Sequence, residues 1–426
     1  MTAIAREEKS TAAVVAGVIG NVLEWFDFGV YGFFASVIGR QFFPSSDPIA
    51  SLLATFAVFA VGFFFRPLGA FVFGHYGDRA GRRNALAVTV ILMAISTFAI
   101  GVMPTYKDIG VWAPILLVVA RLAQGLSAGG EWGGATSFLV EYAPENRRGY
   151  IGSFQQVSVA AGFLLGALTG SLVTSTMAPD AVLRWGWRLP FIFGIVVGGV
   201  GLYMRLGLPD TPKFREVARA GQVAKSPLVE TLRTHPREVL LSMGFTLLWT
   251  VSYYVLLTYM PTYLSQVVKL PLNRALISNS VAILFLVILI PILGALSDRI
   301  GRKPLLILSA IGFLLFTYPI FILISGGNFL TIVLSQMAYA LILACFSGPG
   351  PAALAEIFPT RLRYSALSIG YNIAVMAFGG TAPFIATWLI SVTHNPMAPT
   401  FYVIVSALIT LFVNISLKET YKEALK

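Results

Sequence analysis

An apolar and aromatic stretch near the N-terminus carries four polar side chains, Asn21, Glu24, Asp27 and Tyr31. Their spacing of three, three and four residues places them on one face of a helix. If this helix begins at Ala12 and crosses a membrane, Glu24 lies roughly 18 Å from its start, near the middle of the bilayer. A carboxylate at that depth is costly and indicates a functional site, such as one that binds and releases a proton. The alternative is a structural carboxylate that is satisfied by arginine or backbone partners.

Two arginines in apolar segments offer the opposite charge. Arg66 either extends toward the membrane surface or faces the carboxylates at positions 24 and 27, and the sequence leaves both alternatives open. Arg121 lies within roughly 80° of arc of Gln124 and Glu131 on one predicted helix. We expect Arg121 to hold a carboxylate group of a substrate. Further candidates for substrate contact are the polar neighbours of these charges and polar or aromatic residues of other apolar segments, namely Asn21, Tyr31, Gln124, Glu131, Gln155, Tyr253 and Asn372.

The segment that contains Arg121 is also rich in glycine. Gly125 and Gly129 have a spacing of four residues, which allows a neighbouring helix to approach closely. A nucleotide-binding loop is excluded, because no strand precedes these glycines and they lie within an apolar helix.

The composition explains where these charged residues lie. The chain is 57% hydrophobic and only 12% charged, against about 25% charged in an ordinary soluble domain. Apolar runs long enough to cross a bilayer core of roughly 30 Å recur along the chain, and they must be helices because lipid offers no partner for free backbone groups. We therefore expect an all-α polytopic membrane protein with twelve transmembrane helices, near residues 12–40, 49–75, 84–103, 112–142, 147–176, 187–207, 238–265, 273–298, 303–325, 329–357, 361–391 and 397–417.

The net charge of +11 is explained by membrane topology and not by a nucleic-acid partner. Most of the Lys and Arg residues fall in the segments that share the side of the N-terminus, which is the positive-inside pattern. We therefore expect a multi-pass protein of the cell inner membrane with both termini in the cytoplasm. The single cysteine, Cys345, excludes an intramolecular disulfide. The three histidines, His75, His235 and His394, lack the spacing of a metal site, which disfavours a membrane metalloenzyme.

A short basic turn occurs twice, about half a chain apart. Its copies are Gly74-His-Tyr-Gly-Asp78-Arg79-Ala-Gly-Arg82-Arg83 and Gly294-Ala-Leu-Ser-Asp298-Arg299-Ile-Gly-Arg302. A second pair of matching segments surrounds Glu141 and Glu356. Such a repeat predicts two similar six-helix bundles, 1–207 and 238–426, joined by a cytoplasmic linker, 208–237. An acidic side chain is favoured beside a helix N-terminus, so Asp78 could bind a helix end of the neighbouring half.

With twelve predicted helices, the two basic turns resemble those of the major facilitator superfamily. Three further segments are similar to its metabolite:proton symporter family: Gly20-Asn21 with Glu24-Trp25-Phe26-Asp27, Arg66-Pro67-Leu68-Gly69, and Gln124-Gly125 with Gly129-Gly130-Glu131. The segments Tyr253–Leu264 and Arg363–Leu367, with Tyr371-Asn372-Ile373, are most similar to the proline/betaine branch of that family.

The resemblance implies two pseudo-symmetric bundles that alternate access to a central site. We expect Asp27, assisted by Glu24, to take up a proton, and Arg121 or Arg66 to hold a substrate carboxylate. The resemblance further implies that residues of the repeated turns and their acidic partners form the cytoplasmic gate: Asp78, Arg79, Arg82, Glu141, Asp298, Arg299, Arg302 and Glu356.

The expected function is import of a small carboxylate-bearing metabolite by proton symport. The metabolite is either a zwitterion such as proline or betaine, or an organic acid such as α-ketoglutarate or citrate. Proton-driven export by the same fold and substrate sensing without transport are the alternatives. The expected partners are the substrate, protons and the lipid bilayer, with no cofactor, metal or nucleic acid, and we expect a monomer.

Overall fold

The structure, a computed structural model, describes residues 21–22, 24–80, 82–129, 131–206, 236–358, 367, 369–423 and 425. All regular secondary structure in these ranges is helical. Residues 24–33 are helical and lead into the first half, which comprises α2 (Ala35–Phe42), α3 (Pro48–Phe64), α4 (Arg66–Ala80), α5 (Arg82–Val102), α6 (Tyr106–Ile109), α7 (Trp112–Ala128), α8 (Glu131–Tyr142), η1 (Glu145–Arg147), α9 (Arg148–Thr176), α10 (Pro179–Ala181), η2 (Val182–Gly186) and α11 (Arg188–Leu206). The second half comprises α14 (Pro236–Tyr254), η3 (Val255–Tyr259), α15 (Met260–Gln266), α16 (Leu272–Ile300), α17 (Arg302–Gly326), α18 (Phe329–Ser347), α19 (Gly350–Glu356), η4 (Val375–Gly379), α21 (Ala382–Thr393) and α22 (Ala398–Ser416).

These helices account for the twelve predicted membrane spans. Eight helical stretches of the described chain are long and apolar enough to cross a bilayer, and a ninth span bends by 51° between Pro179–Gly186 and Arg188–Tyr203. Two shorter apolar helices, Ala87–Val102 and Trp112–Ala128, and the helical residues 24–42 supply the other three. The predicted fold is thereby confirmed. The start of the first span and most of the predicted linker lie outside the described residues, so the domain boundaries stay a prediction.

The helix ends follow local chemistry. The side chain of Asp47 accepts a hydrogen bond of 2.9 Å from the backbone N–H of Ile49 and caps α3, with Pro48 as the first helical residue. Asn328 caps α18 in the same way, by accepting from the N–H of Thr331. Both caps lie in short connections between spans, so the chain can turn without leaving the first N–H groups of the next helix unpaired.

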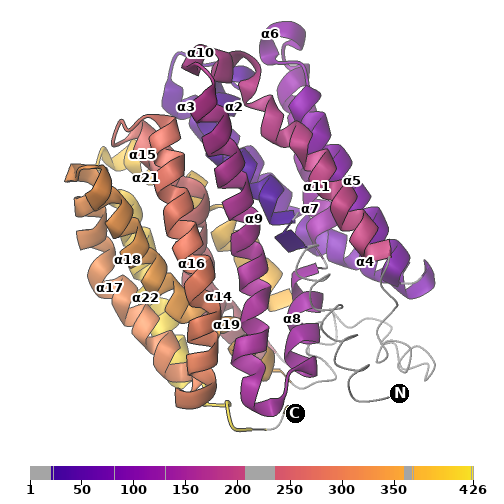
Figure 1. The fold of residues 1–426 in the computed structure, drawn as a ribbon, viewed down its shortest axis with the longest axis vertical. Helices are drawn as coiled ribbons and strands as arrows, with labels where there is room; N and C mark the ends of the chain where they lie inside the picture. The colour runs from indigo at the N-terminus through magenta and orange to yellow at the C-terminus, as the bar shows by residue number, and fades with distance from the viewer. Residues whose placement is uncertain are drawn as a thin grey trace.

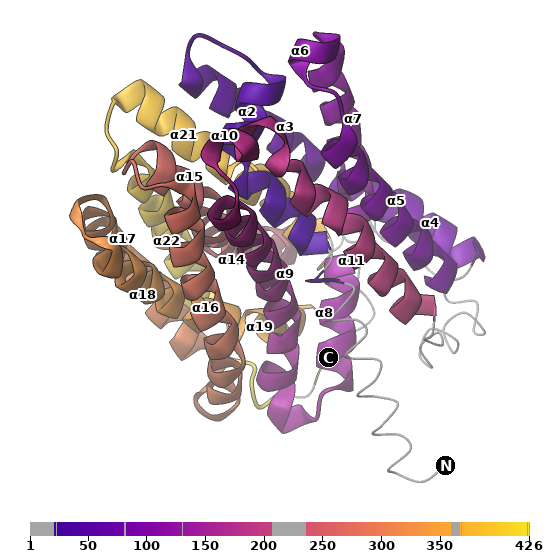
Figure 2. The same cartoon turned by 45° about the horizontal axis from the view of Figure 1, so that its top comes forward.

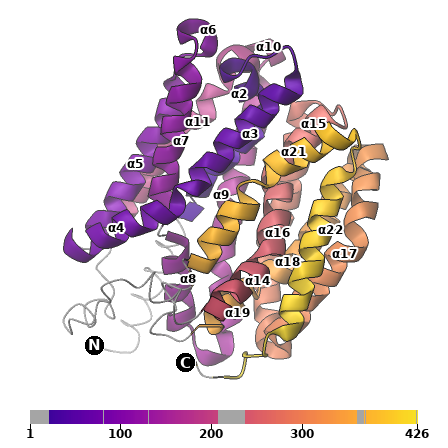
Figure 3. The same cartoon turned by 180° about the vertical axis from the view of Figure 1, so that it is seen from behind.

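The two halves meet along paired helices. Helix α9 of the first half packs along α16 of the second (Figure 1, Figure 2). Viewed from behind, α3 lies beside α21 (Figure 3). The surface between the halves is therefore built from helices of both.

Glycines let α7 approach α3 and α4 closely. A Cβ added to Gly125 would lie 1.8 Å from the carbonyl oxygen of Gly62, and one added to Gly129 would lie 2.0 Å from that of Arg66. Larger side chains cannot fit there without moving the backbone. The predicted role of the glycine spacing, close helix approach, is thus confirmed, and it brings Arg66 and Arg121 into the same bundle.

Candidate functional site

An ion pair lies buried in the first half. Arg66 Nη2 at the start of α4 is 2.7 Å from Glu24 Oε1 on the first span, and their side chains are 0% and 4% exposed. The same nitrogen donates to the carbonyl oxygen of Ala128 at the end of α7, at 3.2 Å. Of the two alternatives for Arg66, the buried one is what the structure contains. Burying both charges is tolerable because they are paired.

Aromatic rings surround the guanidinium of Arg66. Its Cζ lies 5.2 Å from the ring centroid of Trp25, 5.7 Å from that of Phe28 and 5.5 Å from that of Phe63, which are cation–π distances. Within the described residues, Nε and Nη1 of Arg66 have no hydrogen-bond partner. The guanidinium of Arg66 is therefore held through Nη2, while its Nε and Nη1 donors are unused within the described residues.

Asp27 belongs to a different network. Its carboxylate accepts a hydrogen bond from the hydroxyl of Thr97 on α5. The same hydroxyl oxygen accepts from Gln124 Nε2 at 2.8 Å, and Gln124 Oε1 accepts from Arg121 Nη1 at 2.7 Å. A continuous chain of side chains thus connects the carboxylate of the first span to the arginine of α7.

Arg121 is fully buried among rings of the first half. Its Cζ is 4.8 Å from the centroid of Phe28, 4.5 Å from that of Tyr31 and 5.1 Å from that of Phe59. It also donates to the carbonyl oxygen of Phe59 at 3.3 Å. Arg121 is thus enclosed by partners from its own half.

The polar face of the first span therefore meets several helices. Asn21 donates to Ser158 on α9 at 2.7 Å and accepts from Trp25 Nε1 at 3.1 Å, while the hydroxyl of Tyr31 donates to the carbonyl oxygen of Thr55 on α3 at 3.1 Å. The spacing along the first span correctly placed its polar residues in the interior. It could not indicate that Glu24 and Asp27 would have separate partners.

Aromatic rings of both halves meet in the central region. The rings of Trp132 on α8 and Tyr371 stack with centroids 3.5 Å apart and planes 3° apart, and Trp249 on α14 lies 6.0 Å from Trp132. Tyr254 contacts the rings of Trp25 and Phe63 across the surface between the halves. Rings from both halves thus contact one another in the central region.

The remaining predicted substrate residues lie around this region. Asn372 donates to the carbonyl oxygen of Gly129 in the other half, at 3.1 Å. Tyr253 is buried, with its ring 6.3 Å from that of Phe163. Gln155 is buried on α9 and accepts from Gln156 at 2.6 Å. The side chain of Glu131 lies outside the part of the chain that is described.

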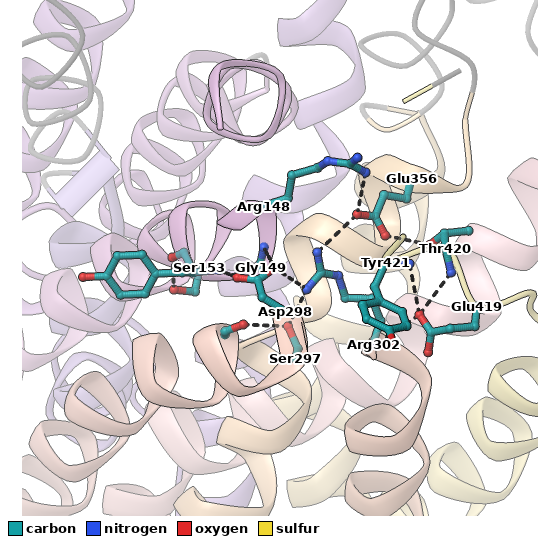
Figure 4. Close-up of polar contacts among 12 residues, drawn as sticks. Arg148, Gly149, Ser153, Ser297, Asp298, Arg302, Glu356, Glu419, Thr420 and Tyr421 are labelled. Atoms are coloured by element: carbon teal, nitrogen blue, oxygen red, sulfur yellow. Dashed lines mark hydrogen bonds and ion pairs between the residues drawn. The ribbon is translucent and has the colours of Figure 1, made fainter. Parts of the chain in front are cut away.

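A second cluster joins the halves at the end of the molecule opposite to α6, and Figure 4 shows it in detail. Asp298 near the end of α16 accepts hydrogen bonds from the backbone N–H groups of Gly149 and Tyr150, both at 2.8 Å. These N–H groups belong to the first turn of α9, where a negative charge is favoured by the helix dipole. A carboxylate of the second half thus caps a helix of the first.

Three charged residues extend this cluster (Figure 4). Arg302 binds Asp298 at 2.7 Å and Glu356 at 3.4 Å, and Arg148 binds Glu356 at 3.2 Å. Since Arg148 belongs to the first half and Glu356 to the second, this pair also crosses between the halves. Of the other predicted gate residues, Arg299 is exposed and Glu141 is half-buried, while the side chains of Asp78, Arg79 and Arg82 lie outside the described part.

The segment that follows α22 completes the cluster. Glu419 accepts from the backbone N–H groups of Arg302 at 3.1 Å and Lys303 at 2.8 Å, and so caps α17. In return, Lys303 Nζ donates to the carbonyl oxygens of Ile415 and Leu417 at the end of α22. Thr420 donates to Glu356 Oε2 at 2.6 Å. The tail is therefore fastened to the same carboxylate that binds Arg148.

Several of these residues were missed by the sequence reasoning. Thr97 is one of three hydroxyl residues in the apolar helix α5, with Thr89 and Ser96, and nothing in the sequence distinguishes it from the other two. Arg148 was not singled out by the sequence, and Glu419 and Thr420 had no motif that distinguished them.

The chain has relatives of known function along its whole length. The profile of the family described as "Sugar (and other) transporter" matches residues 12–225 and 217–426. The chain is 40% identical over 423 residues to the glycine betaine/proline/ectoine/pipecolic acid transporter of Dickeya dadantii, covering 97% of this chain and 84% of that protein. It is 40% identical over 427 residues to the proline/betaine transporter of Salmonella typhimurium, covering 98% and 85% respectively.

Solved structures of lower identity have the same fold. The xylose transporter of Escherichia coli, in a partially occluded inward-open conformation, has a TM-score of 0.76 at 20% identity and covers 98% of this chain and 100% of its own. A D-xylose-proton symporter has a TM-score of 0.74 at 20% identity, with 94% and 97% covered. At this identity the two structures establish the arrangement of the helices and nothing about the cargo.

Proposed function

Since the chain belongs to the sugar (and other) transporter family of the major facilitator superfamily, and within it to the proline/betaine branch, we propose that it imports a small zwitterion together with protons. The chain is a transporter and not an enzyme, and it is a multi-pass protein of the bacterial inner membrane. The proton coupling, the cargo and the direction of transport are the parts that we propose.

The observation that carries the proposed coupling is the position of Asp27. Its carboxylate is buried, and the hydroxyl oxygen of Thr97 lies within hydrogen-bonding distance of both this carboxylate and the carbonyl oxygen of Met93, the latter at 2.9 Å. A hydroxyl has one hydrogen and can donate to only one of them at a time. When Asp27 is ionised, Thr97 donates to it. When Asp27 is protonated, it can donate to Thr97, whose own hydrogen then turns to Met93.

The change in hydrogen bonding at Thr97 is connected to Arg121 on α7 through Gln124. Because Gln124 donates to Thr97 and accepts from Arg121, a change in the charge of Asp27 alters the whole chain of hydrogen bonds. A proton can drive transport only if it stabilises one conformation more than another, and this connection supplies such a difference. Glu24, which binds Arg66, assists Asp27 in the coupling, and either Arg121 or Arg66 holds the carboxylate of the substrate.

The proposed cargo follows from the relatives. Two of them are named as transporters of proline and betaine, and one of these names adds ectoine and pipecolic acid. Each of these molecules combines a carboxylate with a cationic nitrogen. An organic acid such as α-ketoglutarate or citrate was the other candidate in the sequence, and no relative described above carries it in its name.

Uptake into proteoliposomes tests the proposal. The purified chain should accumulate radiolabelled glycine betaine or proline when the outside is acidified, and an uncoupler should abolish the accumulation. Uptake that ignores the proton gradient would contradict the proposed coupling. Accumulation only when the gradient is reversed would favour the exporter instead.

The proposed transport cycle requires a defined orientation of the protein in the membrane. Both termini lie in the cytoplasm, so the cluster around Asp298 forms the cytoplasmic gate, with Asp78, Arg79, Arg82 and Glu141 in the matching turn. The chain acts as a monomer and uses the proton as its only coupling species, without a cofactor. Reporter fusions to each terminus test the orientation, since a terminus outside the cytoplasm would reverse the assignment of the gate.

A further inference from the structure

The two buried arginines differ in what they have left to offer a ligand. The hydrogen bonds and ring contacts of Arg121 in the described chain come from Phe28, Tyr31, Phe59 and Gln124, all in the first half. Arg121 is also connected through Gln124 and Thr97 to Asp27. Nε of Arg121 also lacks a hydrogen-bond partner in the described chain, but both of its Nη groups make hydrogen bonds, so a carboxylate that bound them would have to displace Gln124 or the carbonyl oxygen of Phe59.

Arg66 has unused donors in the same interior. Only its Nη2 makes hydrogen bonds in the described chain, to Glu24 and to the carbonyl oxygen of Ala128, although the whole side chain is buried. Its Nε and Nη1 groups have no hydrogen-bond partner among the described residues. Buried N–H donors that lack a partner are costly, and a ligand carboxylate would satisfy them with charge-assisted hydrogen bonds.

The rings beside Arg66 come from both halves. Trp25 belongs to the first span, and its centroid lies 6.3 Å from that of Tyr254 on α14. Phe63 lies 5.4 Å from Tyr254. The hydroxyl of Tyr254 is buried and has no hydrogen-bond partner in the described chain. Movement of one half relative to the other would separate these rings and open the space beside Arg66.

We propose that Arg66, and not Arg121, holds the carboxylate of the substrate, and that Trp25 and Tyr254 hold its cationic nitrogen. This assignment rests on the proposed function. Aromatic faces attract quaternary ammonium groups, which have no N–H to donate. Glu24, already beside Arg66, adds a negative charge on the side where the cation binds. Arg121 remains the partner of the Asp27 network.

The charge balance of this site selects against organic acids. Glu24 and Arg66 together carry no net charge, so a zwitterion of zero net charge leaves the buried site neutral. A dicarboxylate would bring two negative charges to this pair, whose single arginine is already balanced by Glu24. Uncompensated charge in a buried site is strongly unfavourable, so the pair discriminates by repulsion as well as by attraction.

Three ligands of similar shape test each end of the site separately. Glycine betaine has both charges, choline lacks the carboxylate, and 3,3-dimethylbutanoate replaces the ammonium by an uncharged carbon. Equilibrium binding of each is measured on the purified full-length protein. We expect the wild type to prefer glycine betaine to either analogue by at least about tenfold, which corresponds to about 1.4 kcal/mol.

Substitutions then show which residues bind the carboxylate and which bind the ammonium group of the ligand. Arg66→Gln should bring the ratio of the choline and betaine dissociation constants close to one, whereas the matched variant Arg121→Gln should keep the wild-type ratio. Tyr254→Leu should remove the preference over 3,3-dimethylbutanoate, and Tyr254→Phe, which keeps the ring, should retain it. Arg66→Lys keeps the charge beside Glu24 and guards against misfolding of Arg66→Gln; it should weaken betaine binding by about tenfold at an unchanged melting temperature.

A wild-type ratio in Arg66→Gln together with a lost ratio in Arg121→Gln would overturn the assignment and place the carboxylate on Arg121. If Arg66→Gln does not fold, unchanged betaine affinity in Arg66→Lys would overturn it as well. Wild-type protein that binds neither glycine betaine nor proline would instead contradict the proposed function itself, so the two failures are distinguishable.

Discussion

Asp298 accepts a hydrogen bond of 2.8 Å from the backbone N–H of Gly149, so a carboxylate of the second half caps the first turn of α9 in the first half. The sequence predicted such a contact with a helix end of the opposite half for Asp78, the acid of the first copy of the repeated turn. The structure contains a contact of this kind at Asp298, the acid of the second copy. The corresponding side chain of the first copy, Asp78, lies outside the described residues.

Asp298→Asn should loosen this end of the molecule. Hydrogen bonds to a charged group contribute about 1.5–3 kcal/mol, and the amide oxygen still accepts one of the two N–H groups. We expect the population open at this end to rise roughly five- to tenfold, by the usual arithmetic of two-state equilibria. Maleimide labelling of Ser153→Cys in a Cys345→Ser background measures it, because Ser153 is buried on α9 against Gly294 of α16.

Arg299→Gln is the matched control for this experiment, because Arg299 is an exposed neighbour of Asp298. Labelling should be as slow in that variant as in the parent. An unchanged labelling rate in Asp298→Asn would show that the helix cap does not hold the halves together.

Glu419→Ala should weaken the same region from the tail. Glu419 caps α17 through two backbone N–H groups, and the loss of such a cap costs about 1 kcal/mol. We expect a lower melting temperature and faster labelling of Ser153→Cys, with a smaller effect in Glu419→Gln. Lys418→Ala is the control, since the side chain of Lys418 is 75% exposed. Equal effects of Glu419→Ala and Lys418→Ala would mean that the tail contributes no specific contact.

Tyr371→Leu should disturb the closure at the central region. The ring of Tyr371 stacks on Trp132 across the two halves, and aromatic pairs contribute about 0.5–1.5 kcal/mol beyond their buried area. We expect a lower maximal uptake rate in proteoliposomes, because the closed state that the stack stabilises becomes less populated. Tyr371→Phe keeps the ring and should transport at a rate close to that of the wild type. The stack would have no role if Leu and Phe behaved alike.

The sequence predicted the fold well because membrane helices obey strong local rules. The length of each apolar run and the two copies of the basic turn required no knowledge of distant contacts. The polar face of the first span could likewise be read from its spacing. The close approach of α7 to α3 and α4 could also be predicted, since Gly125 and Gly129 are four residues apart.

The choice of partners could not be predicted in this way. Glu24 binds Arg66 and Asp27 binds Thr97, although both acids lie on one face of one helix. Which acid meets which helix depends on the packing angles of three separate spans, which sequence spacing does not encode. The tail contacts of Glu419 depend in the same way on where α22 ends relative to α17.

Glu24 and Asp27 have different partners, Arg66 and Thr97, and we propose that Asp27 is the acid that carries the coupling proton. Proteoliposomes that contain Asp27→Asn are compared with wild type in two assays, proton-driven accumulation of glycine betaine and exchange of labelled for unlabelled glycine betaine without a gradient. We expect Asp27→Asn to lose accumulation and keep exchange, and Asp108→Asn, which changes an exposed acid of α6, to keep both. Accumulation coupled to the proton gradient as in the wild type in Asp27→Asn would contradict this assignment, and the same result in Glu24→Gln would exclude both acids of the first span as carriers of the coupling proton.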